Sequence, residues 1–259
     1  LTGLGIKDSI SSISKNQFSG ENAVAKYDAQ IVLNDRNVSG ISPEETLAGV
    51  KEDVRVKDAI LTHMRTLNGS SEREPDTVLP VSILVPGNTE DLQNFIKLQN
   101  RKTGEAYTLN SEGVLVSEKF AAKTKTNPGD EIFVTLNDGS NVNMKVAGVV
   151  ENYAFHYIYM TKELYTQTFG EEPVFDFITA KLSDNIKSMD ETERNAEKTK
   201  LATDLAKRDD ISVVVYTDQA VNTFNKLLKG LDALVFIFVG SAGALAFVVL
   251  YNLSNININ

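Results

Sequence analysis

The chain has 259 residues, a formal net charge of −9 at pH 7 and no cysteine. This length allows one large domain or two small ones with a proper hydrophobic core. The acidic balance argues against a nucleic-acid partner, because phosphate binding needs clustered lysine and arginine. It also argues against docking of the polar part on an anionic lipid surface. Without cysteine there is neither a disulfide framework nor a thiolate metal site.

The chain begins on an apolar stretch, LTGLGI, which lacks the basic first segment of a signal peptide. We interpret residues 1–13 as the outer end of a preceding membrane helix. Ile6, Ile10 and Ile13 would continue one face of that helix into the polar part of the chain.

The polar part predicts a mixture of helices and strands. Ser42 has the features of a helix cap, with Pro43 at the first helical position and Glu44 and Glu45 at the positive end of the helix dipole. Residues 68–75 are predicted to form a loop. Strands are predicted at 27–33, 54–64 and 77–85, with Pro80 at an edge or a bulge. A helix is predicted at 89–99, capped by Asn88 or Thr89. Its inward side chains would be Leu92, Phe95, Ile96 and Leu98.

The second half contains the strongest local pattern, a β-hairpin. Ile132 and Val134 alternate with polar residues, residues 137–140 form a turn, and Val142 and Met144 resume the alternation. The other predicted elements are a strand and helix at 113–124 with Ser117 as cap, a strand at 156–160, a helix after Thr161 that stops at Gly170, a strand at 174–182, a charged helix at 189–208 and a strand at 211–216.

An uncharged, proline-free segment of 19 residues, Ala233–Tyr251, lies near the end of the chain. As a helix it would span about 28 Å, close to the thickness of a bilayer core. We predict a transmembrane helix here, since its length and position argue against a buried core helix. Gly240 and Ala244 lie four residues apart and would let a neighbouring helix approach closely. Residues 252–259 would begin a cytoplasmic segment.

The preceding residues predict a stalk helix, 218–232, that continues into the membrane segment. Phe224 and Leu228 lie on it, and only Gly230 interrupts it. Because no glycine-rich or proline-rich linker separates the two, we expect this stalk to couple movements of the membrane helix to the polar domain. That domain would comprise residues 14–217, with subdomains at 27–110 and 111–217.

Residue patterns for chemistry are few, so the sequence predicts no catalytic residue, no cofactor and no metal site. His63 and His156 are the two histidines, and neither has metal-site spacing. Neither a nucleophile elbow nor a P-loop occurs. Two further groups favour structural roles: the acids Glu191, Glu193 and Glu197 as a solvated helix face, and the aromatics Tyr153, Phe155, Tyr157 and Tyr159 as one packing face of a strand.

Three stretches together resemble one family of membrane proteins. They are GVLVSEKFAAKTKTNPGDEI, VAGVVENYAFHYIYMTKELY and LDALVFIFVGSAGALAFVVLYNLSNININ. In these stretches the chain is similar to FtsX/MacB-type ABC transporter permeases of the Gram-positive type. The resemblance covers most of 113–259 and the stub at 1–13, whereas 30–110 is less diagnostic. These stretches match the general pattern of the family and are not catalytic signatures. They therefore identify the class of protein better than its substrate.

This resemblance implies an α+β, MacB-like extracellular domain of mixed sheets with flanking helices, ending in a transmembrane helix. It implies a location at the cell membrane with the main domain outside. A separate ABC-type ATPase would hydrolyse ATP, and the permease would form a dimer or pair with a second permease half. The chain itself would not be an enzyme: it would transmit movement for export, lipoprotein handling or regulation of cell-wall enzymes.

Two hypotheses that assign the chain to other classes of protein remain open. An extracellular sensor domain of a membrane receptor or histidine kinase also lies between two membrane helices. The second alternative is a membrane-tethered hydrolase, although no motif supports it. The sequence identifies neither a transported substrate nor an extracellular partner.

Overall fold

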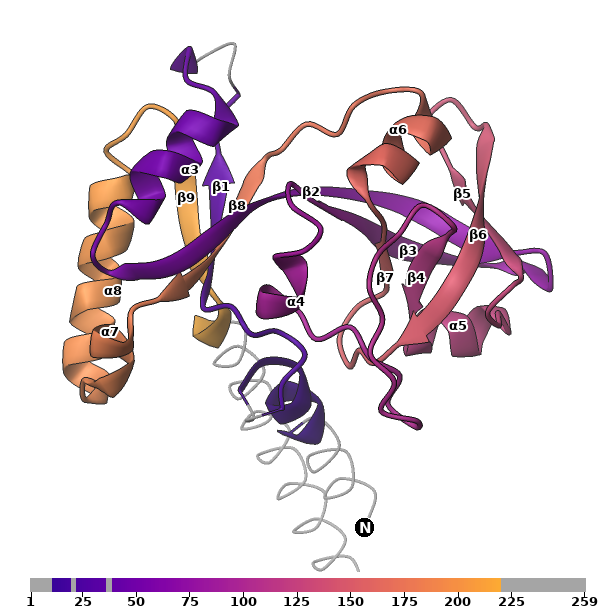
Figure 1. The fold of residues 1–259 in the computed structure, drawn as a ribbon, viewed down its shortest axis with the longest axis horizontal. Helices are drawn as coiled ribbons and strands as arrows, with labels where there is room; N and C mark the ends of the chain where they lie inside the picture. Colours follow the sequence, from indigo (N-terminus) through magenta and orange to yellow (C-terminus); the bar gives the residue numbers. More distant parts are fainter. Residues whose placement is uncertain (1–10, 20–21, 36–38, 220–259) are drawn as a thin grey trace, which may run out of the picture.

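A single sheet of nine strands organises the computed structural model, which describes residues 11–19, 22–35 and 39–219. The strand order is β3-β7-β4-β6-β5-β2-β8-β1-β9, and β3 also pairs with β2. This extra pairing closes β2, β3, β7, β4, β6 and β5 into a barrel. Strands β8, β1 and β9 extend from the other half of β2 as an open sheet. Figure 1 shows the two lobes side by side, with α3 and α8 on the sheet lobe and α5 and α6 on the barrel.

The strands are β1 (Ala29–Leu33), β2 (Val56–Ser71), β3 (Glu74–Pro86), β4 (Val114–Ser117), β5 (Glu131–Thr135), β6 (Asn141–Val150), β7 (Tyr157–Tyr159), β8 (Phe177–Leu182) and β9 (Ile211–Tyr216). The helices are the π-helix η1 (Lys15–Ser19), α3 (Pro43–Lys51), α4 (Leu92–Phe95), α5 (Glu118–Thr124), α6 (Lys162–Phe169), α7 (Asp184–Ser188) and α8 (Glu191–Leu205). Parallel pairs (β3–β7 and β4–β6) occur beside antiparallel ones. The predicted α+β class, a mixed sheet with flanking helices, is therefore confirmed.

Strand β2 belongs to both lobes. Its first part, from Val56 to Thr62, pairs with β8, and the part from Thr62 to Ser71 pairs with β3. The last four residues also pair with β5 on the other side. The predicted loop at 68–75 is wrong for this reason: both edges of Asn68–Ser71 are hydrogen-bonded, and the turn is confined to Glu72 and Arg73. A Cβ at Gly69 would lie 2.8 Å from the Val81 side chain, which explains a glycine inside a strand.

The sheet lobe buries one face of its four strands beneath α3, α7 and α8. Small and branched residues alternate on that face in register, with Ala29 opposite Ala180 and Ile31 opposite Ile178. Leu201 and Leu205 of α8 pack onto the same cluster. The predicted helix at 189–208 is confirmed with shorter bounds, because the Asp190 side chain caps α8 by accepting from the N–H groups of Thr192 and Glu193.

The barrel has its own core, in which every strand contributes inward side chains. Phe120 of α5 and Tyr165 of α6 are fully buried against it. The predicted hairpin is confirmed as β5 and β6, with Ile132 opposite Met144 and Val134 opposite Val142. Gly170 ends α6 in the left-handed conformation, as predicted.

The predicted helix at 89–99 is reduced to the four residues of α4. Leu92, Phe95, Ile96 and Leu98 are buried as predicted. The helix ends early because Ile96 adopts extended backbone and forms a bridge with Ala25. Neither predicted cap is used, since α4 begins after Asp91. Here a tertiary strand contact overrides a local helical pattern.

The predicted aromatic row on one strand face is wrong in part. Tyr157 and Tyr159 lie on β7 with their rings stacked at 5.6 Å. Tyr153 and Phe155 precede the strand, and Phe155 has a positive φ of 61° that is incompatible with β structure. The row therefore breaks in a tight loop at 151–156.

The strand pairings cut across the expected division between 27–110 and 111–217. Strands β8 and β9 come from the second part of the chain, yet they pair with β1 and β2 from the first. The barrel strands are instead inserted in sequence between β1 and β8, which are neighbours in the sheet lobe.

No helix among the described residues is long and apolar enough to cross a membrane. Thr217–Gln219 are helical, and the rest of the predicted stalk lies outside the described residues. The predicted membrane helix at 233–251 and most of the stub at 1–13 also lie outside them.

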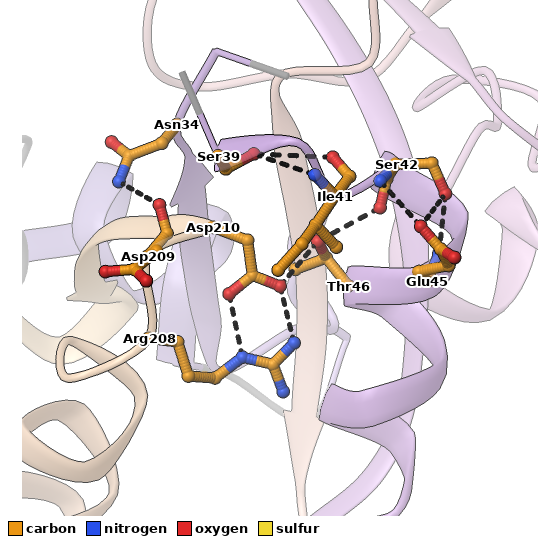
Figure 2. A network of polar contacts seen from close by, with 9 residues as sticks. All are labelled: Asn34, Ser39, Ile41, Ser42, Glu45, Thr46, Arg208, Asp209 and Asp210. Atoms are coloured by element: carbon orange, nitrogen blue, oxygen red, sulfur yellow. Dashed lines mark hydrogen bonds and ion pairs between the residues drawn. The ribbon is translucent and has the colours of Figure 1, made fainter. Parts of the chain in front are cut away.

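A buried polar network fixes α3 to the loop before β9 (Figure 2). Asp210 is 2% exposed and accepts two hydrogen bonds from the Arg208 guanidinium, at 2.8 and 2.5 Å. The Thr46 hydroxyl donates to the same carboxylate at 2.8 Å. Nearby, Ser42 caps α3 as predicted, and Glu45 completes a capping box with it. The hydrogen bonds from Arg208 lower the pKa of Asp210 against the opposing effect of burial.

We predict that Asp210→Asn lowers the free energy of unfolding by about 2 kcal/mol, because the buried end of the Arg208 pair loses its charge. The neighbouring Asp209→Asn is the control, since Asp209 is exposed and only its main-chain carbonyl accepts, from Asn34. Denaturant unfolding of both variants measures the difference. Equal stability of the two variants would contradict the role given to the network.

The ion pair between Arg208 and Asp210 also predicts that the free energy of unfolding depends on pH. The folded-state pKa of Asp210 lies below its ordinary value of 3.8, so the carboxylate stabilises the fold fully above that pH. This contribution is lost as the pH falls through the folded pKa. The stability difference between wild type and Asp210→Asn should therefore shrink below about pH 4. If this stability difference instead grew as the pH fell, the stabilising role given to the Asp210 carboxylate would be excluded.

Candidate functional site: the base junction

The chain enters and leaves the domain through two neighbouring strands. β1 and β9 are antiparallel, with Ala29 opposite Tyr216. The Thr217 N–H donates to the Asp28 carbonyl at 2.9 Å, and the Thr217 hydroxyl donates to the Tyr27 carbonyl at 3.2 Å. In Figure 1 the indigo segment that carries η1 and the orange end of β9 lie at the same end of the molecule. We call this region, residues 15–19, 22–28, 95–99, 151–156 and 216–218, the base junction.

The incoming segment folds back on itself before β1 begins. The N–H of Val24 donates to the Asn16 carbonyl at 3.0 Å, and that of Ala25 donates to the Gln17 carbonyl at 2.9 Å. The segment then lies along the residues after α4: Lys97 N–H donates to Val24 at 2.8 Å. Its main chain is thus fixed on two sides before it reaches the sheet.

Gln17 joins the incoming segment to the barrel. Its side chain is buried, and its amide oxygen accepts from the N–H of Tyr153 at 2.7 Å and from that of Ala154 at 3.2 Å. One side chain of η1 therefore satisfies two main-chain donors in the loop between β6 and β7. Removing it would leave buried N–H groups without partners.

A half-buried ion pair makes a second connection between the same parts. Lys97 Nζ lies 3.0 Å from Glu151 Oε2 and donates to the Asn22 carbonyl at 2.7 Å. The Tyr153 hydroxyl donates to Glu151 Oε1 at 2.6 Å. Burial works to raise the pKa of Glu151, but hydrogen bonds from Tyr153 and Lys97 lower it overall. Burial and the Glu151 carboxylate raise the pKa of Tyr153 to about 12.

The barrel loop at 151–156 is under local strain. Phe155 has a positive φ, and the residue is 66% exposed. Among the described residues, the Oδ1 of buried Asn152 and the Nδ1 of His156 have no hydrogen-bond partner. Burial, then the nearby Lys123 and Lys119, lower the pKa of His156. Strained segments of this kind are typical of places that change conformation.

The outgoing segment is tied to the sheet lobe instead. Lys198 of α8 is 7% exposed and forms an ion pair with Asp218. Its Nζ lies 4.4 Å from the centre of the Tyr216 ring, and the Tyr216 hydroxyl donates to the Lys198 carbonyl at 2.6 Å. The two ends of the domain are thus anchored to different lobes while being paired with each other.

The base junction is packed and holds no ligand-sized cavity at its centre. The space enclosed by Gln17, Phe18, Met64, Phe155 and Tyr157 amounts to about 20 Å³, enough for one water molecule.

The candidates that the sequence singled out for chemistry are separated in the structure. His63 is buried in β2, with Nδ1 at 2.6 Å from the Val174 carbonyl and Nε2 at 3.2 Å from the Tyr165 hydroxyl. No group of three metal-binding side chains occurs in the described part of the chain. Glu191 and Glu193 are exposed on α8 and Glu197 is half-buried, close to the predicted solvated face.

The predicted coupling and packing residues lie beyond Gln219, outside the described residues; they are Phe224, Leu228, Gly230, Gly240 and Ala244. The sequence did not reveal Gln17, Lys97 or Glu151. No short motif contains them, and Gln17 meets Tyr153 across 136 residues of chain. In the sequence, Tyr153 stands out only as one of a row of aromatics.

No protein-family model and no curated protein matches the chain. Solved structures are similar to it at low identity. The periplasmic region of MacB from Actinobacillus actinomycetemcomitans is 14% identical with a TM-score of 0.44, over 78% of this chain and 94% of that one. The extracellular domain of YknZ, described as a noncanonic ABC-type transporter from Gram-positive bacteria, is 18% identical with a TM-score of 0.40, over 62% and 87%.

A third similar structure is a domain of a protein described as a permease, from Porphyromonas gingivalis. It is 15% identical with a TM-score of 0.37, over 67% of this chain and 84% of that one. At these identities and scores the function has to be argued from the chain's own residues.

We predict that Gln17→Leu lowers the free energy of unfolding by about 2 kcal/mol, because two N–H groups of the barrel loop lose their acceptor. Hydrogen exchange should accelerate first at the amides of Tyr153 and Ala154. Gln167→Leu, at an exposed position of α6, is the matched control. If exchange in the 151–156 loop is the same in both variants, Gln17 does not hold the loop.

Proposed function

We propose that the chain is the extracellular domain and adjoining membrane helix of an ABC transporter permease subunit. The proposal rests on the family resemblance of the sequence, on the apolar segment at 233–251, and on the base junction. The single observation that carries the coupling role is the antiparallel pairing of β1 with β9.

The mechanism follows from this pairing. Two segments joined by a hydrogen-bonded ladder move as one body, since sliding them apart breaks several bonds at once. The incoming segment contacts the barrel through Gln17 and Lys97, and the outgoing segment contacts the sheet lobe through Lys198. A displacement applied at the chain ends would therefore reach both lobes together.

The expected domain organisation and partners belong to this proposal. Residues 1–13 and 233–251 would be membrane helices on either side of an extracellular domain, and 218–232 would be the stalk between domain and bilayer. A separate ABC-type ATPase would supply the energy in the cytoplasm. Gly240 and Ala244 would contact a helix of a second permease copy or half, and lipid would surround the rest.

The work done outside the membrane would be export, lipoprotein handling or regulation of cell-wall enzymes. A sensor domain of a membrane receptor or histidine kinase is the alternative, because the same junction would transmit movement inward. Affinity purification of the intact protein from membranes separates the two. Recovery of an ABC-type ATPase supports the permease, and recovery of a kinase activity without it supports the sensor.

We predict that inserting two or three glycines between Leu228 and Gly230 uncouples the external domain from ATP hydrolysis, because a flexible stalk does not transmit displacement. These 259 residues contain no cysteine, so Asn137→Cys on the exposed β5–β6 turn provides one site in them for a spin label. Pulsed electron resonance between two permease copies should show a distance that changes on ATP binding in the parent protein and not in the insertion variant.

The control inserts the same glycines beside Gly104, in an exposed turn with open space around it. That variant should keep the nucleotide-dependent distance change. A stalk variant that also keeps it would rule out mechanical coupling through residues 218–232.

A further inference from the structure

An open groove of about 750 Å³ lies beside α5, on the barrel. Most of its lining comes from three places: the turn after Asn100, the segment from α5 to Pro128, and the turn between β2 and β3. One lining residue, Glu118, is acidic. Five are cationic, namely Arg73, Arg101, Lys102, Lys119 and Lys125. The groove is therefore basic, although the chain as a whole has a net charge of −9.

Two of these cations have no acidic partner in the described part of the chain. Lys102 is exposed and forms no ion pair there. Lys119 donates to the neutral main-chain carbonyl of Tyr153 at 2.5 Å. Burial is the main cause that lowers the pKa of His156, and the positive charges of Lys123 and Lys119 lower it further. The groove thus carries a positive field that the protein's own carboxylates do not cancel.

The other three cations are paired but keep donors for a ligand. Arg101 contacts Glu118 through Nε alone, at 2.9 and 3.0 Å. Arg73 contacts Asp130 through Nη2 at 2.7 Å. The side chains of Arg73, Arg101 and Lys125 are 54%, 49% and 71% exposed. A guanidinium can bind two oxygens side by side, so its open N–H groups suit a ligand with several acceptor oxygens.

The main chain at Lys125 gives an independent indication. Lys125 ends α5 in the left-handed conformation, with a φ of 53°. Glycine is the usual residue at such a position, because a Cβ makes this conformation unfavourable. Gly170 occupies the equivalent position at the end of α6. The chain therefore has a cation in the groove at a position where glycine would fit the backbone better.

The cations are distributed over both ends of α5. Arg101 pairs with Glu118, the first residue of the helix, and Lys125 directly follows the last. The seven residues of α5 span about 10 Å at the rise of an α-helix. A ligand that contacts both ends therefore needs anionic groups about 10 Å apart.

We propose that this groove binds a ligand with two phosphate groups about 10 Å apart, joined by a carbon chain. Phosphate is favoured over carboxylate because three of the five cations already share a carboxylate of the protein. A phosphate monoester has a larger charge at pH 7 and three acceptor oxygens, so it can add to such a pair. Small or apolar side chains complete the lining and would contact the carbon chain; they are Ala121, Ala122, Pro128 and Val149.

This inference goes beyond the proposed permease function and does not depend on it. A coupling role would be complete without a ligand at α5, and a phosphate site would serve a sensor domain equally well. The two proposals also fail separately. Ligand titration needs no ATPase, whereas the stalk insertion is judged by a distance that changes on ATP binding.

The test titrates the intact protein, in nanodiscs of zwitterionic lipid, with 1,6-hexanediol bisphosphate and measures binding by calorimetry. We expect this probe to bind at least about tenfold more tightly than hexyl monophosphate, because the second phosphate binds at a high effective concentration. Hydrogen exchange should slow at residues 100–104 and 119–127 in the complex. These segments line the groove.

Lys125→Gly is the decisive variant, because it removes a cation from the groove and also suits the left-handed backbone. Its affinity for the bisphosphate should fall about tenfold, while its melting temperature should not fall. Lys207→Ala is the matched control. The Lys207 side chain is also 71% exposed and pairs with one carboxylate, Asp204, but it follows α8 in the sheet lobe. This variant should bind the bisphosphate like the parent protein.

Two outcomes would overturn the proposal. Equal affinity for the bisphosphate and the monophosphate would show that the groove does not bind two phosphates at once. Equal bisphosphate affinity of Lys125→Gly and Lys207→Ala would place the binding outside the groove.

A second titration identifies the source of the phosphates. It compares discs that contain cardiolipin, a lipid with two phosphates, with phosphatidylglycerol discs of equal charge. Weaker bisphosphate binding in the cardiolipin discs alone would assign a lipid headgroup as the natural ligand, and equal binding would assign a soluble one. Both results support the phosphate site.

Discussion

The ladder between β1 and β9 is the interaction on which the arrangement of the domain depends. It brings together residues that are nearly two hundred positions apart, such as Ala29 and Tyr216. The barrel and the helices α3 to α8 lie between these two strands in sequence. Whatever acts on either end of the domain therefore acts on a single hydrogen-bonded unit.

The second constraint is the continuity of β2 through both lobes. A flexible linker would let the barrel and the sheet lobe move independently, but here one strand of 16 residues is paired in both. The segment that leads into β1 is joined to the barrel part of the chain at the base junction, where Gln17 accepts from the N–H of Tyr153 and Lys97 donates to the Asn22 carbonyl. Two separate connections make hinge motion between the lobes costly, so movement of the domain as a whole is the easier response to a displacement at its ends.

Much of the fold was predictable where the determining contacts are local. The cap at Ser42, the stop at Gly170 and the β5–β6 hairpin depend on residues within a few positions of one another. The failures share a tertiary cause. Ser70 and its neighbours form strand because two other strands pair with them, and the helix at α4 stops because Ile96 bridges to Ala25. Propensity is a weak guide when the main chain has partners from elsewhere.

The base junction could not have been predicted from the sequence at all, because its residue types are ordinary. A buried glutamine, a lysine–glutamate pair and a tyrosine carry meaning only once the fold places them between a chain end and a strained loop. The edge of β9 is different. Its uncharged, branched sequence was visible from the start, but a buried central strand would read the same way. Topology alone distinguishes the two, since the strand order leaves β9 with one neighbour.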